Sequence, residues 1–125
     1  MRTMLKSKIH RARVTGLSLD YKGSITIDKS LMAKADILPY EQVQVLNLNN
    51  GARFTTYAIE GEADSGEVCI NGAAARLAKK GDIILILAFC QVEEDEAATF
   101  LPRLVYMGSH NRIIESRHVI DTLSF

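Results

Sequence analysis

A turn and a strand adjoin in the stretch Tyr21-Lys22-Gly23-Ser24-Ile25-Thr26-Ile27-Asp28, where apolar and polar residues alternate after a Gly-Ser pair. The order strand, helix, strand occurs twice in the chain. The first unit has strands at residues 24–27 and 43–46 with a helix from Ser30 between them, and the second has strands at residues 67–70 and 83–86 with a helix from Gly72 between them. We interpret this repeat as a duplicated unit that closes into a small barrel, because closure leaves no exposed strand edges.

Most of the other segments also have strand patterns. Strands are expected at residues 6–14, 54–59 and 104–107, with Asn49-Asn50-Gly51 as a hairpin turn before residue 54. Residues 83–89 form a continuous apolar run, which predicts a strand buried on both faces.

Three short helices are expected. In the first, residues 30–37, Leu31, Ala35 and Leu38 share one face. Asn71 is placed to cap a second helix over residues 72–79, and Gly81 to stop it. Residues 93–100 suit a third helix, with acidic side chains at its N-terminal end.

Length and composition indicate one globular domain. The chain has 125 residues, 47% of them hydrophobic, and carries 15 basic and 15 acidic side chains. A net charge of zero argues against nucleic acid as the main partner, since binding to phosphates needs a basic excess.

The chain also lacks membrane and metal signals. Its longest apolar stretch has eight residues, and its N-terminal residues lead into no secretory signal, so we expect a cytoplasmic protein without a membrane partner. Cys69 and Cys90 lie in apolar runs, which predicts reduced thiols, and neither has the spacing of a metal ligand to a histidine.

The Gly-Ser pair is a candidate site of self-cleavage. The Ser24 hydroxyl can attack the Gly23 carbonyl carbon, because glycine has no Cβ to block the approach and tolerates unusual dihedral angles. Attack converts the amide into an ester, and elimination then leaves a pyruvoyl group at Ser24. An isolated Gly-Ser pair is more often an ordinary turn.

The segment Asn50-Gly51-Ala52-Arg53-Phe54-Thr55-Thr56-Tyr57 offers groups that suit such a reaction. Arg53 presents a planar fork for a carboxylate, the Thr56 hydroxyl can stabilise a tetrahedral intermediate, and Tyr57 can return a proton to carbon. On a strand, Thr56 and Tyr57 face opposite sides, so they reach one site only between strands, between subunits or at a bulge.

Two further segments can bind anions. Asn71-Gly72-Ala73-Ala74-Ala75-Arg76 has small residues at a predicted helix start, which leave free backbone N–H groups open to a carboxylate. Lys8 and His10 share one strand face and can meet a second carboxylate. Each segment alone also has a simpler explanation, as a capped helix or a solvated strand.

The combination of motifs carries a resemblance. Lys8-Ile9-His10-Arg11, residues 21–28, residues 50–57 and residues 71–76 with Gly81-Asp82 together resemble the bacterial pyruvoyl-dependent aspartate α-decarboxylases over roughly residues 1–107. The resemblance implies a mainly β fold, a six-stranded double-psi β-barrel with short helices. It implies conversion of L-aspartate to β-alanine and CO2 for pantothenate and coenzyme A biosynthesis. It also implies self-cleavage into residues 1–23 and 24–125, and a homotetramer of four short and four long chains.

The resemblance also implies residue roles. Ser24 becomes the pyruvoyl group, which forms a Schiff base with the substrate amine and acts as an electron sink, without metal or pyridoxal phosphate. Tyr57 matches the proton donor, and Thr56 matches a residue that assists processing at Gly23 and Ser24 and contacts substrate. The positions that match substrate-binding residues are Lys8, Arg53, Thr56, Gly72, Ala73 and Ala74. The positions that match supporting residues are His10, Tyr21 and Asn71.

The chain departs from the family pattern in two places. Lys22 stands where an acidic residue is frequent, and residues 108–125 match no known pattern, so we expect a variable tail there. The resemblance leaves open whether a maturation factor is needed for cleavage.

Two alternatives remain at this point. An N-terminal-nucleophile hydrolase also cuts before a serine but keeps the new amine as a base. A non-catalytic barrel could instead bind DNA or another protein through the basic strand residues Lys6, Lys8, Arg11 and Arg13.

Overall fold

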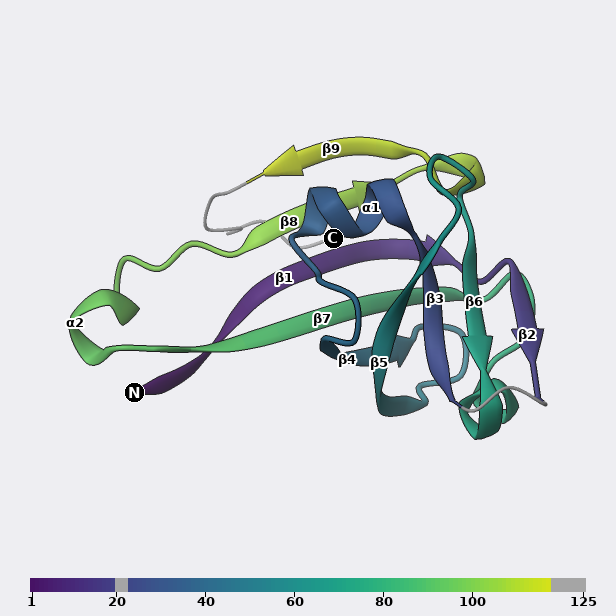
Figure 1. Cartoon of the computed structure of the whole chain (residues 1–125), viewed down its shortest axis with the longest axis horizontal. Coiled ribbons are helices and arrows are strands. Elements are labelled where there is room, and N and C mark those ends of the chain that lie inside the picture. Colours follow the sequence, from purple (N-terminus) through teal and green to yellow (C-terminus); the bar gives the residue numbers. More distant parts are fainter. Residues whose placement is uncertain (20–22, 118–125) are drawn as a thin grey trace.

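Strands dominate the computed structural model, which describes residues 1–19 and 23–117 (Figure 1). The strands are β1 (Arg2–Arg13), β2 (Gly16–Ser18), β3 (Ser24–Asp28), β4 (Gln42–Asn47), β5 (Arg53–Gly61), β6 (Val68–Asn71), β7 (Ile83–Val92), β8 (Arg103–Met107) and β9 (Ile113–Arg117). The helices are α1 (Lys29–Ala35) and α2 (Glu94–Ala97), together with the 3-10 helices η1 (Gly72–Leu77) and η2 (Ser109–Asn111). The predicted mainly β class is confirmed.

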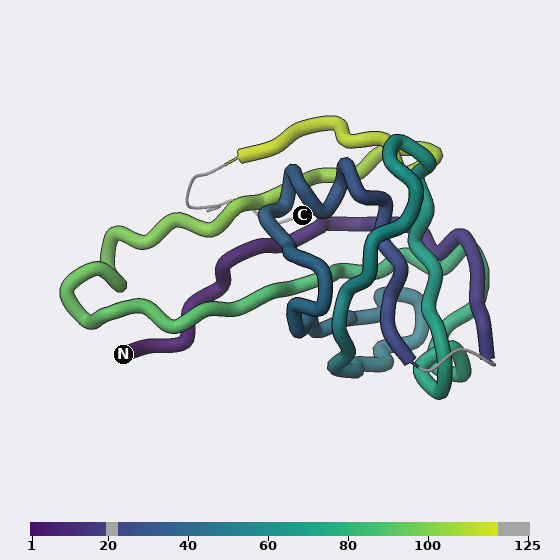
Figure 2. The backbone as a smooth tube through the Cα atoms, viewed as in Figure 1, coloured from purple at the N-terminus to yellow at the C-terminus, as the bar shows by residue number. Residues whose placement is uncertain are grey.

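The strands close into a barrel through the N-terminal segment. Their order is β2-β6-β3-β5-β4-β7-β1-β8-β9, and β1 and β2 are consecutive parts of one extended segment (Figure 2). At the junction, the Val14 N–H donates to the Asp82 carbonyl oxygen at 2.9 Å and the Thr15 N–H to the Val68 carbonyl oxygen at 2.8 Å. The segment therefore bonds to β7 on one side and to β6 on the other, which completes a ring of six strand positions.

In each repeated unit, one further strand of the ring pairs with both strands of the unit, parallel to one and antiparallel to the other. β5 runs parallel to β3 and antiparallel to β4, while the β1–β2 segment runs parallel to β6 and antiparallel to β7. The units also meet directly, since β3 is antiparallel to β6 and β4 is antiparallel to β7. This doubled pattern is that of a double-psi β-barrel, so the predicted duplication and fold are confirmed.

The barrel core consists of the inward-facing side chains of alternating strand positions. The fully buried large side chains on strands are those of Ile9, Ile25, Ile27, Val43, Val45, Val68, Ile70, Ile84, Ile86 and Val105, and Val14 after β1 and Met32 on α1 complete the set. The prediction that β7 is buried on both faces was wrong: Ile84 and Ile86 are buried, whereas Leu85 and Leu87 are half-buried. An antiparallel barrel strand packs only its inner face on the core, so its outer face stays partly open.

The predicted helices exist but are shorter than expected. α1 ends where Asp36 adopts a left-handed conformation, which buries Ile37 and leaves Leu38 65% exposed, so Leu38 was wrongly assigned to the packed face. α2 covers only part of residues 93–100. η1 ends at Leu77 with extended backbone at residue 78, so Gly81 does not stop it.

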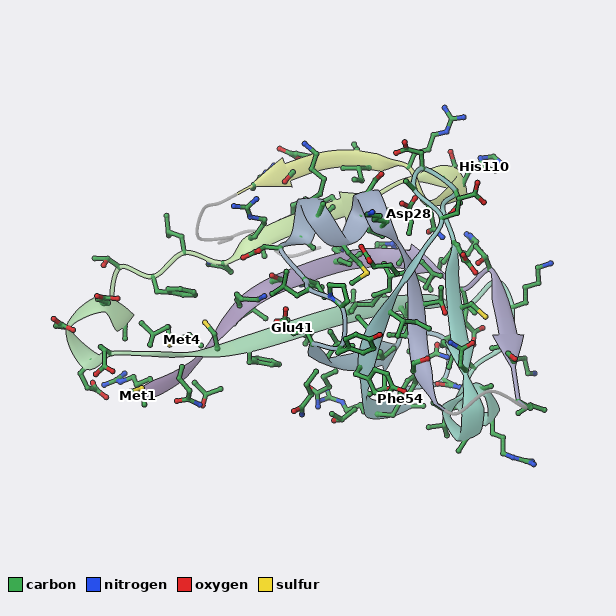
Figure 3. The ribbon with its side chains drawn as sticks, in the orientation of Figure 1. Met1, Met4, Asp28, Glu41, Phe54 and His110 are labelled. Atoms are coloured by element: carbon green, nitrogen blue, oxygen red, sulfur yellow. The ribbon has the colours of Figure 1, made fainter. Side chains whose placement is uncertain are left out.

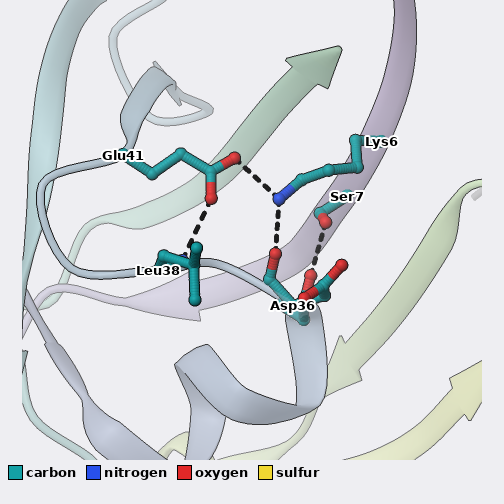
Figure 4. A network of polar contacts seen from close by, with 6 residues as sticks. Lys6, Ser7, Asp36, Leu38 and Glu41 are labelled. Carbon is teal, nitrogen blue, oxygen red and sulfur yellow. Dashed lines mark hydrogen bonds and ion pairs between the residues drawn. The ribbon is translucent and has the colours of Figure 1, made fainter. Parts of the chain in front are cut away.

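A polar network ties the end of α1 to β1 (Figure 4). The Lys6 ammonium forms a half-buried ion pair with Glu41 at 2.7 Å and also donates to the Asp36 carbonyl oxygen. Glu41 in turn accepts the Leu38 N–H at 3.0 Å, and the Ser7 hydroxyl donates to the carbonyl oxygen of residue 35. Lys6 is therefore engaged within the fold, which weakens the idea of a basic strand open to DNA.

Part of the predicted variable tail belongs to the fold. β9 pairs with β8, and the Asn111 side chain accepts the Arg13 N–H at 2.7 Å and donates to the carbonyl oxygens of Arg13 and Gly66, both at 2.8 Å. The Asn111 side-chain amide thus forms the two hydrogen bonds with the Arg13 backbone that a neighbouring strand would form. Residues 118–125 lie outside the described residues.

Asp28 connects α1 to the turn between β5 and β6. Its side chain is 5% exposed and accepts three backbone N–H groups: those of Ser30 at 2.8 Å, Asp64 at 3.0 Å and Gly66 at 2.9 Å. Asp28 and His110 lie at the same end of the barrel (Figure 3), where both line a hollow of about 420 Å³. One carboxylate therefore caps the helix and holds the turn.

We expect Asp28→Ala to lower the free energy of unfolding by about 3 kcal/mol, because a helix cap and two further hydrogen bonds from backbone N–H groups to a buried carboxylate are lost together. Urea denaturation monitored by circular dichroism measures this. Glu62→Ala, a change at an exposed residue of the same turn, is the control and should cost less than about 0.5 kcal/mol. Equal losses in the two variants would contradict this role of Asp28.

Candidate active site

Ser24 is buried although it lies on the outer face of the barrel. It begins β3 opposite Asn71 on β6, and its solvent exposure is 0%. The neighbouring Ile25 and Ile70 face the core, so alternation directs Ser24 and Asn71 outward. The Asn71 side-chain amide donates to the Ser24 hydroxyl oxygen at 2.9 Å. The predicted nucleophile is therefore held by a specific partner.

The backbone at the predicted cleavage point has unusual dihedral angles. Gly23 has φ +75° and Ser24 has φ +145°. Glycine adopts positive φ freely, whereas a serine at +145° is strained and must be held by its surroundings. Strain therefore lies at the peptide bond that was predicted to break. Tyr21, predicted to lie beside it, is outside the described residues.

Asn71 does not act as a helix cap. It precedes η1, but its side chain makes no capping hydrogen bond and turns to Ser24 instead. The predicted cap was wrong because the connection to the next strand forms a 3-10 helix that begins with φ +71° at Gly72, and not an α-helix. The supporting role of Asn71 stays a prediction, and the structure shows its side-chain amide against the Ser24 hydroxyl.

The small residues of η1 follow Asn71 directly. Gly72 is buried, Ala73 is exposed and Ala74 is half-buried. Their amides are thus adjacent in sequence to the residue that contacts Ser24. Their binding of a carboxylate stays a prediction.

Tyr57 lies on the strand next to Ser24. β3 pairs with β5 with Ile25 beside Ala58, so Tyr57 is at the level of Ser24 and on the same outer face. Its ring is 38% exposed and lies 6.5 Å from the Tyr40 ring, between centroids. A hollow of about 330 Å³ beside it is lined by Pro39, Tyr40, Tyr57, Ile59 and Glu60.

Alternation along β5 matches the prediction. Arg53, Thr55 and Tyr57 are exposed, whereas Phe54 and Thr56 are half-buried on the other face. Arg53 and Tyr57 thus share a face with Ser24, and Thr56 does not.

Lys8 and His10 lie on a different part of the barrel. Both face outward from β1 between β7 and β8, whereas Ser24 lies on β3 between β5 and β6. The His10 ring packs edge-on against Tyr106, with centroids 5.6 Å apart. The contact of His10 with Tyr106 could not be predicted from the sequence, because the two residues lie far apart in the chain. One chain therefore does not bring Lys8 and His10 to Ser24.

A second polar network was also missed in the sequence. Asn47 is 2% exposed and donates to the Asp82 carboxylate at 2.8 Å and to the Leu77 carbonyl oxygen at 3.2 Å. Asp82 also accepts the Lys79 N–H at 2.8 Å, and Asn50 donates to the Leu77 carbonyl oxygen at 3.0 Å. This junction fixes the hairpin that carries Arg53 and Tyr57 to the end of η1.

Two further properties concern what the chain can bind. Across residues 1–19 and 23–117, no three His, Cys, Asp or Glu side chains group closely enough to hold a metal ion. Within the same ranges, no helix is both long and apolar enough to cross a membrane. Cys69 and Cys90 are free thiols, as predicted, but half-buried.

Comparison with known proteins identifies the family. A family model described as aspartate decarboxylase matches residues 1–114. The chain belongs to the aspartate decarboxylase family.

Relatives in this family are similar along most of their length. An aspartate 1-decarboxylase of Thermoanaerobacter pseudethanolicus is 60% identical over 111 residues, covering 89% of this chain and 95% of the relative. One from Dehalococcoides mccartyi is 56% identical over 115 residues, with 92% and 93% covered, and one from Moorella thermoacetica is 57% identical over 112 residues, with 90% and 88% covered. The crystal structure of a rationally designed protein, mkDPBB_sym_86, aligns with 66% of this chain and 95% of its own, with a TM-score of 0.48 and 14% identity.

In this aspartate decarboxylase family member, the junction at Asp82 should depend on pH. Hydrogen bonds from the Asn47 side chain and the Lys79 N–H lower the pKa of the Asp82 carboxyl below its usual value. Ionised Asp82 therefore stabilises the fold above the usual carboxyl range, and this stabilisation is lost as pH falls through the lowered pKa. Asp82→Asn should be less stable than the unchanged chain at pH 7, and the difference should shrink below about pH 4.

Urea unfolding at pH 7 and pH 3 measures this difference, with Asp64→Asn on an exposed turn as the control. A deficit of Asp82→Asn that is the same at both pH values would contradict the role of the ionised carboxylate.

Proposed function

We propose that this chain converts L-aspartate to β-alanine and CO2 with a pyruvoyl group made from its own Ser24. The observation that carries the proposal is the buried Ser24 hydroxyl, held by Asn71 beside a strained Gly23–Ser24 bond, in a member of the aspartate decarboxylase family. The relatives named aspartate 1-decarboxylase support the substrate.

Self-cleavage begins with the Ser24 hydroxyl oxygen bonding to the Gly23 carbonyl carbon. The bond from that carbon to the Ser24 nitrogen breaks, and the hydroxyl proton passes to the nitrogen. The ester then loses the Ser24 α-proton and breaks its Cβ–Oγ bond, which releases residues 1–23 as a carboxylate and leaves dehydroalanine. Dehydroalanine tautomerises to an imine, and water replaces its nitrogen, which leaves as ammonia.

The residues around Ser24 fit a small organic group at this position. Asn71 supplies an N–H donor on one side, and the outer face of β5 supplies the Tyr57 hydroxyl on the other. A pyruvoyl carbonyl would supply an electron sink for the electrons left behind when the α-carboxylate departs as CO2.

The residues of the chain have distinct parts in this reaction. Tyr57 gives a proton to the substrate carbon after CO2 leaves, and Thr56 donates a hydrogen bond to the Gly23 carbonyl oxygen during self-cleavage. Arg53 and Lys8 hold substrate carboxylates by charge, with the backbone amides of Gly72, Ala73 and Ala74 as further donors. The roles of Arg53 and Tyr57 rest on the family motif and on the placement of β5 beside β3. The roles of Thr56, whose side chain lies on the other face of β5, and of Lys8, which lies on β1, rest on the motif alone.

We further propose that the working enzyme is a homotetramer in the cytoplasm. Lys8 and His10 lie on β1, away from Ser24, so a complete site needs these side chains from a second copy. Two large exposed side chains, Tyr40 at 78% beside Tyr57 and Leu38 at 65% two residues earlier in the chain, suit burial between copies. The product serves pantothenate and coenzyme A biosynthesis, and warm incubation of the pure chain decides whether a maturation factor is needed.

Ser24→Ala should give an intact and inactive chain, because it removes the attacking hydroxyl. Intact-mass spectrometry after warm incubation should show two fragments of the unchanged protein, split at residues 23 and 24, with the large one lighter by one ammonia than a serine-started chain. Normal β-alanine production by Ser24→Ala would sink the assignment.

Other outcomes of the mass measurement point elsewhere. A cleaved chain that retains serine favours the N-terminal-nucleophile hydrolase. A single uncut mass that persists in cell extract favours a non-catalytic binding module, whereas cleavage only in extract indicates a maturation factor.

Tyr57→Phe should leave self-cleavage intact and lower kcat for aspartate by about 100-fold or more, because general acid catalysis contributes roughly that factor. Tyr40→Phe removes a hydroxyl from the adjacent ring and is the matched control. The assay follows β-alanine release from fully cleaved protein of each variant. Equal effects of the two substitutions would remove Tyr57 from the proton-donor role.

A further inference from the structure

Four side chains form a compact group on the outer face of β3 and β6. Antiparallel register places Ser24 opposite Asn71 and Thr26 opposite Cys69. Side chains two residues apart on a strand share a face, so all four project on the same side. The group lies directly at the predicted cleavage point.

Hydrogen bonds within this group use all the polar functions of the Asn71 amide. Its nitrogen donates to the hydroxyl oxygens of Ser24 and Thr26, each at 2.9 Å. Its oxygen accepts from the Cys69 thiol at 3.4 Å. An asparagine amide offers two donors and one acceptor oxygen, and here each has a partner. This arrangement holds the amide with its nitrogen toward Ser24.

Thr26 and Cys69, the two partners of Asn71 besides Ser24, have surroundings that suit these contacts. A Cβ atom built at Gly61 would lie 3.1 Å from the Thr26 methyl carbon, closer than an ordinary contact, so glycine at this position gives that methyl room beside β5. Burial, with the Glu67 carboxylate as a smaller cause, raises the pKa of the Cys69 thiol, which keeps it protonated as a donor.

We propose that Thr26 and Cys69 are positioning residues for self-cleavage, which fix the side-chain amide of Asn71 with its nitrogen toward the Ser24 hydroxyl oxygen. This proposal rests on the proposed function and names two residues to which the resemblance assigns no role. Without these partners, the Asn71 side-chain amide can flip and place its oxygen toward Ser24. That oxygen would then accept a hydrogen bond from the Ser24 hydroxyl.

The orientation matters at both steps of the chemistry. During attack, the Asn71 N–H occupies one lone pair of the Ser24 oxygen, which leaves a second lone pair for the Gly23 carbonyl carbon and the hydroxyl proton free to pass to the nitrogen. During elimination, the same N–H can donate to the ester oxygen as it leaves with Gly23 as a carboxylate. A donor at this point stabilises the charge that develops on the oxygen.

Thr26→Val tests the first partner, because valine keeps the shape and removes the hydroxyl. We expect self-cleavage to slow by about five- to tenfold, the effect of one lost neutral hydrogen bond. The serine-retaining fraction of the large fragment should rise, because ester hydrolysis competes better with a slower elimination. Thr26→Ser should restore the rate, and Thr55→Val, on the exposed face of β5, should leave it unchanged.

Cys69→Ala tests the second partner, with Cys90→Ala as the matched control at the other half-buried free thiol. We expect a slowing of about two- to threefold, because a thiol is a weak donor, and recovery in Cys69→Ser. The thermal midpoint of each variant is measured alongside, and it should match the unchanged chain within a few degrees.

The Asn71→Ala background gives the decisive comparison. Thr26→Val should have no further effect on cleavage there, because its partner is gone. The proposal is overturned if Thr26→Val cleaves at the unchanged rate, if Thr26→Ser is as slow as Thr26→Val, or if the two substitutions slow cleavage independently of Asn71. Failure of the unchanged chain to form a pyruvoyl group would overturn the proposed function instead.

Discussion

The antiparallel register between β3 and β6 is the constraint on which both the barrel and the site depend. It joins the two repeated units, because β3 belongs to one and β6 to the other. It also directs Ile25 and Ile70 into the core and Ser24 and Asn71 outward. A slip of one residue would exchange these faces and bury polar groups in place of isoleucine. Core packing therefore enforces the position of the Ser24 hydroxyl.

The same register explains how strain persists at the start of β3. Ser24 has φ +145°, a conformation that costs energy and survives only when the surroundings fix it. β5 pairs with β3 on one side from Ile25, and β6 pairs on the other from Ser24 itself. Two neighbouring strands thus hold Ser24 in place, and in the proposed self-cleavage the relief of its strain would favour breaking the Gly23–Ser24 bond.

The alternation of apolar and polar residues predicted the strands well, because in a strand it shows which side chains face the core, as along β3 and β5. The duplicated unit was visible for the same reason. Leu38 and η1 were mispredicted, because a left-handed Asp36 and a Gly72 at φ +71° redirect the chain in ways that apolar spacing does not encode. The contacts of Asn71 and Asn47 could not be predicted, since their partners Ser24 and Asp82 come from segments far away in the sequence.

One chain brings together the groups proposed for self-cleavage but not all those proposed for aspartate. Ser24 and Asn71 meet on adjacent strands of a single barrel, so their geometry depends on the fold alone. Lys8 lies on β1, whose neighbours are β7 and β8, and its side chain faces outward rather than toward the Ser24 of the same chain. A dicarboxylate needs more positive charge than Arg53 supplies on this face. Under the proposed function, the fold of one chain therefore makes the reactive group, and assembly completes the substrate site around it.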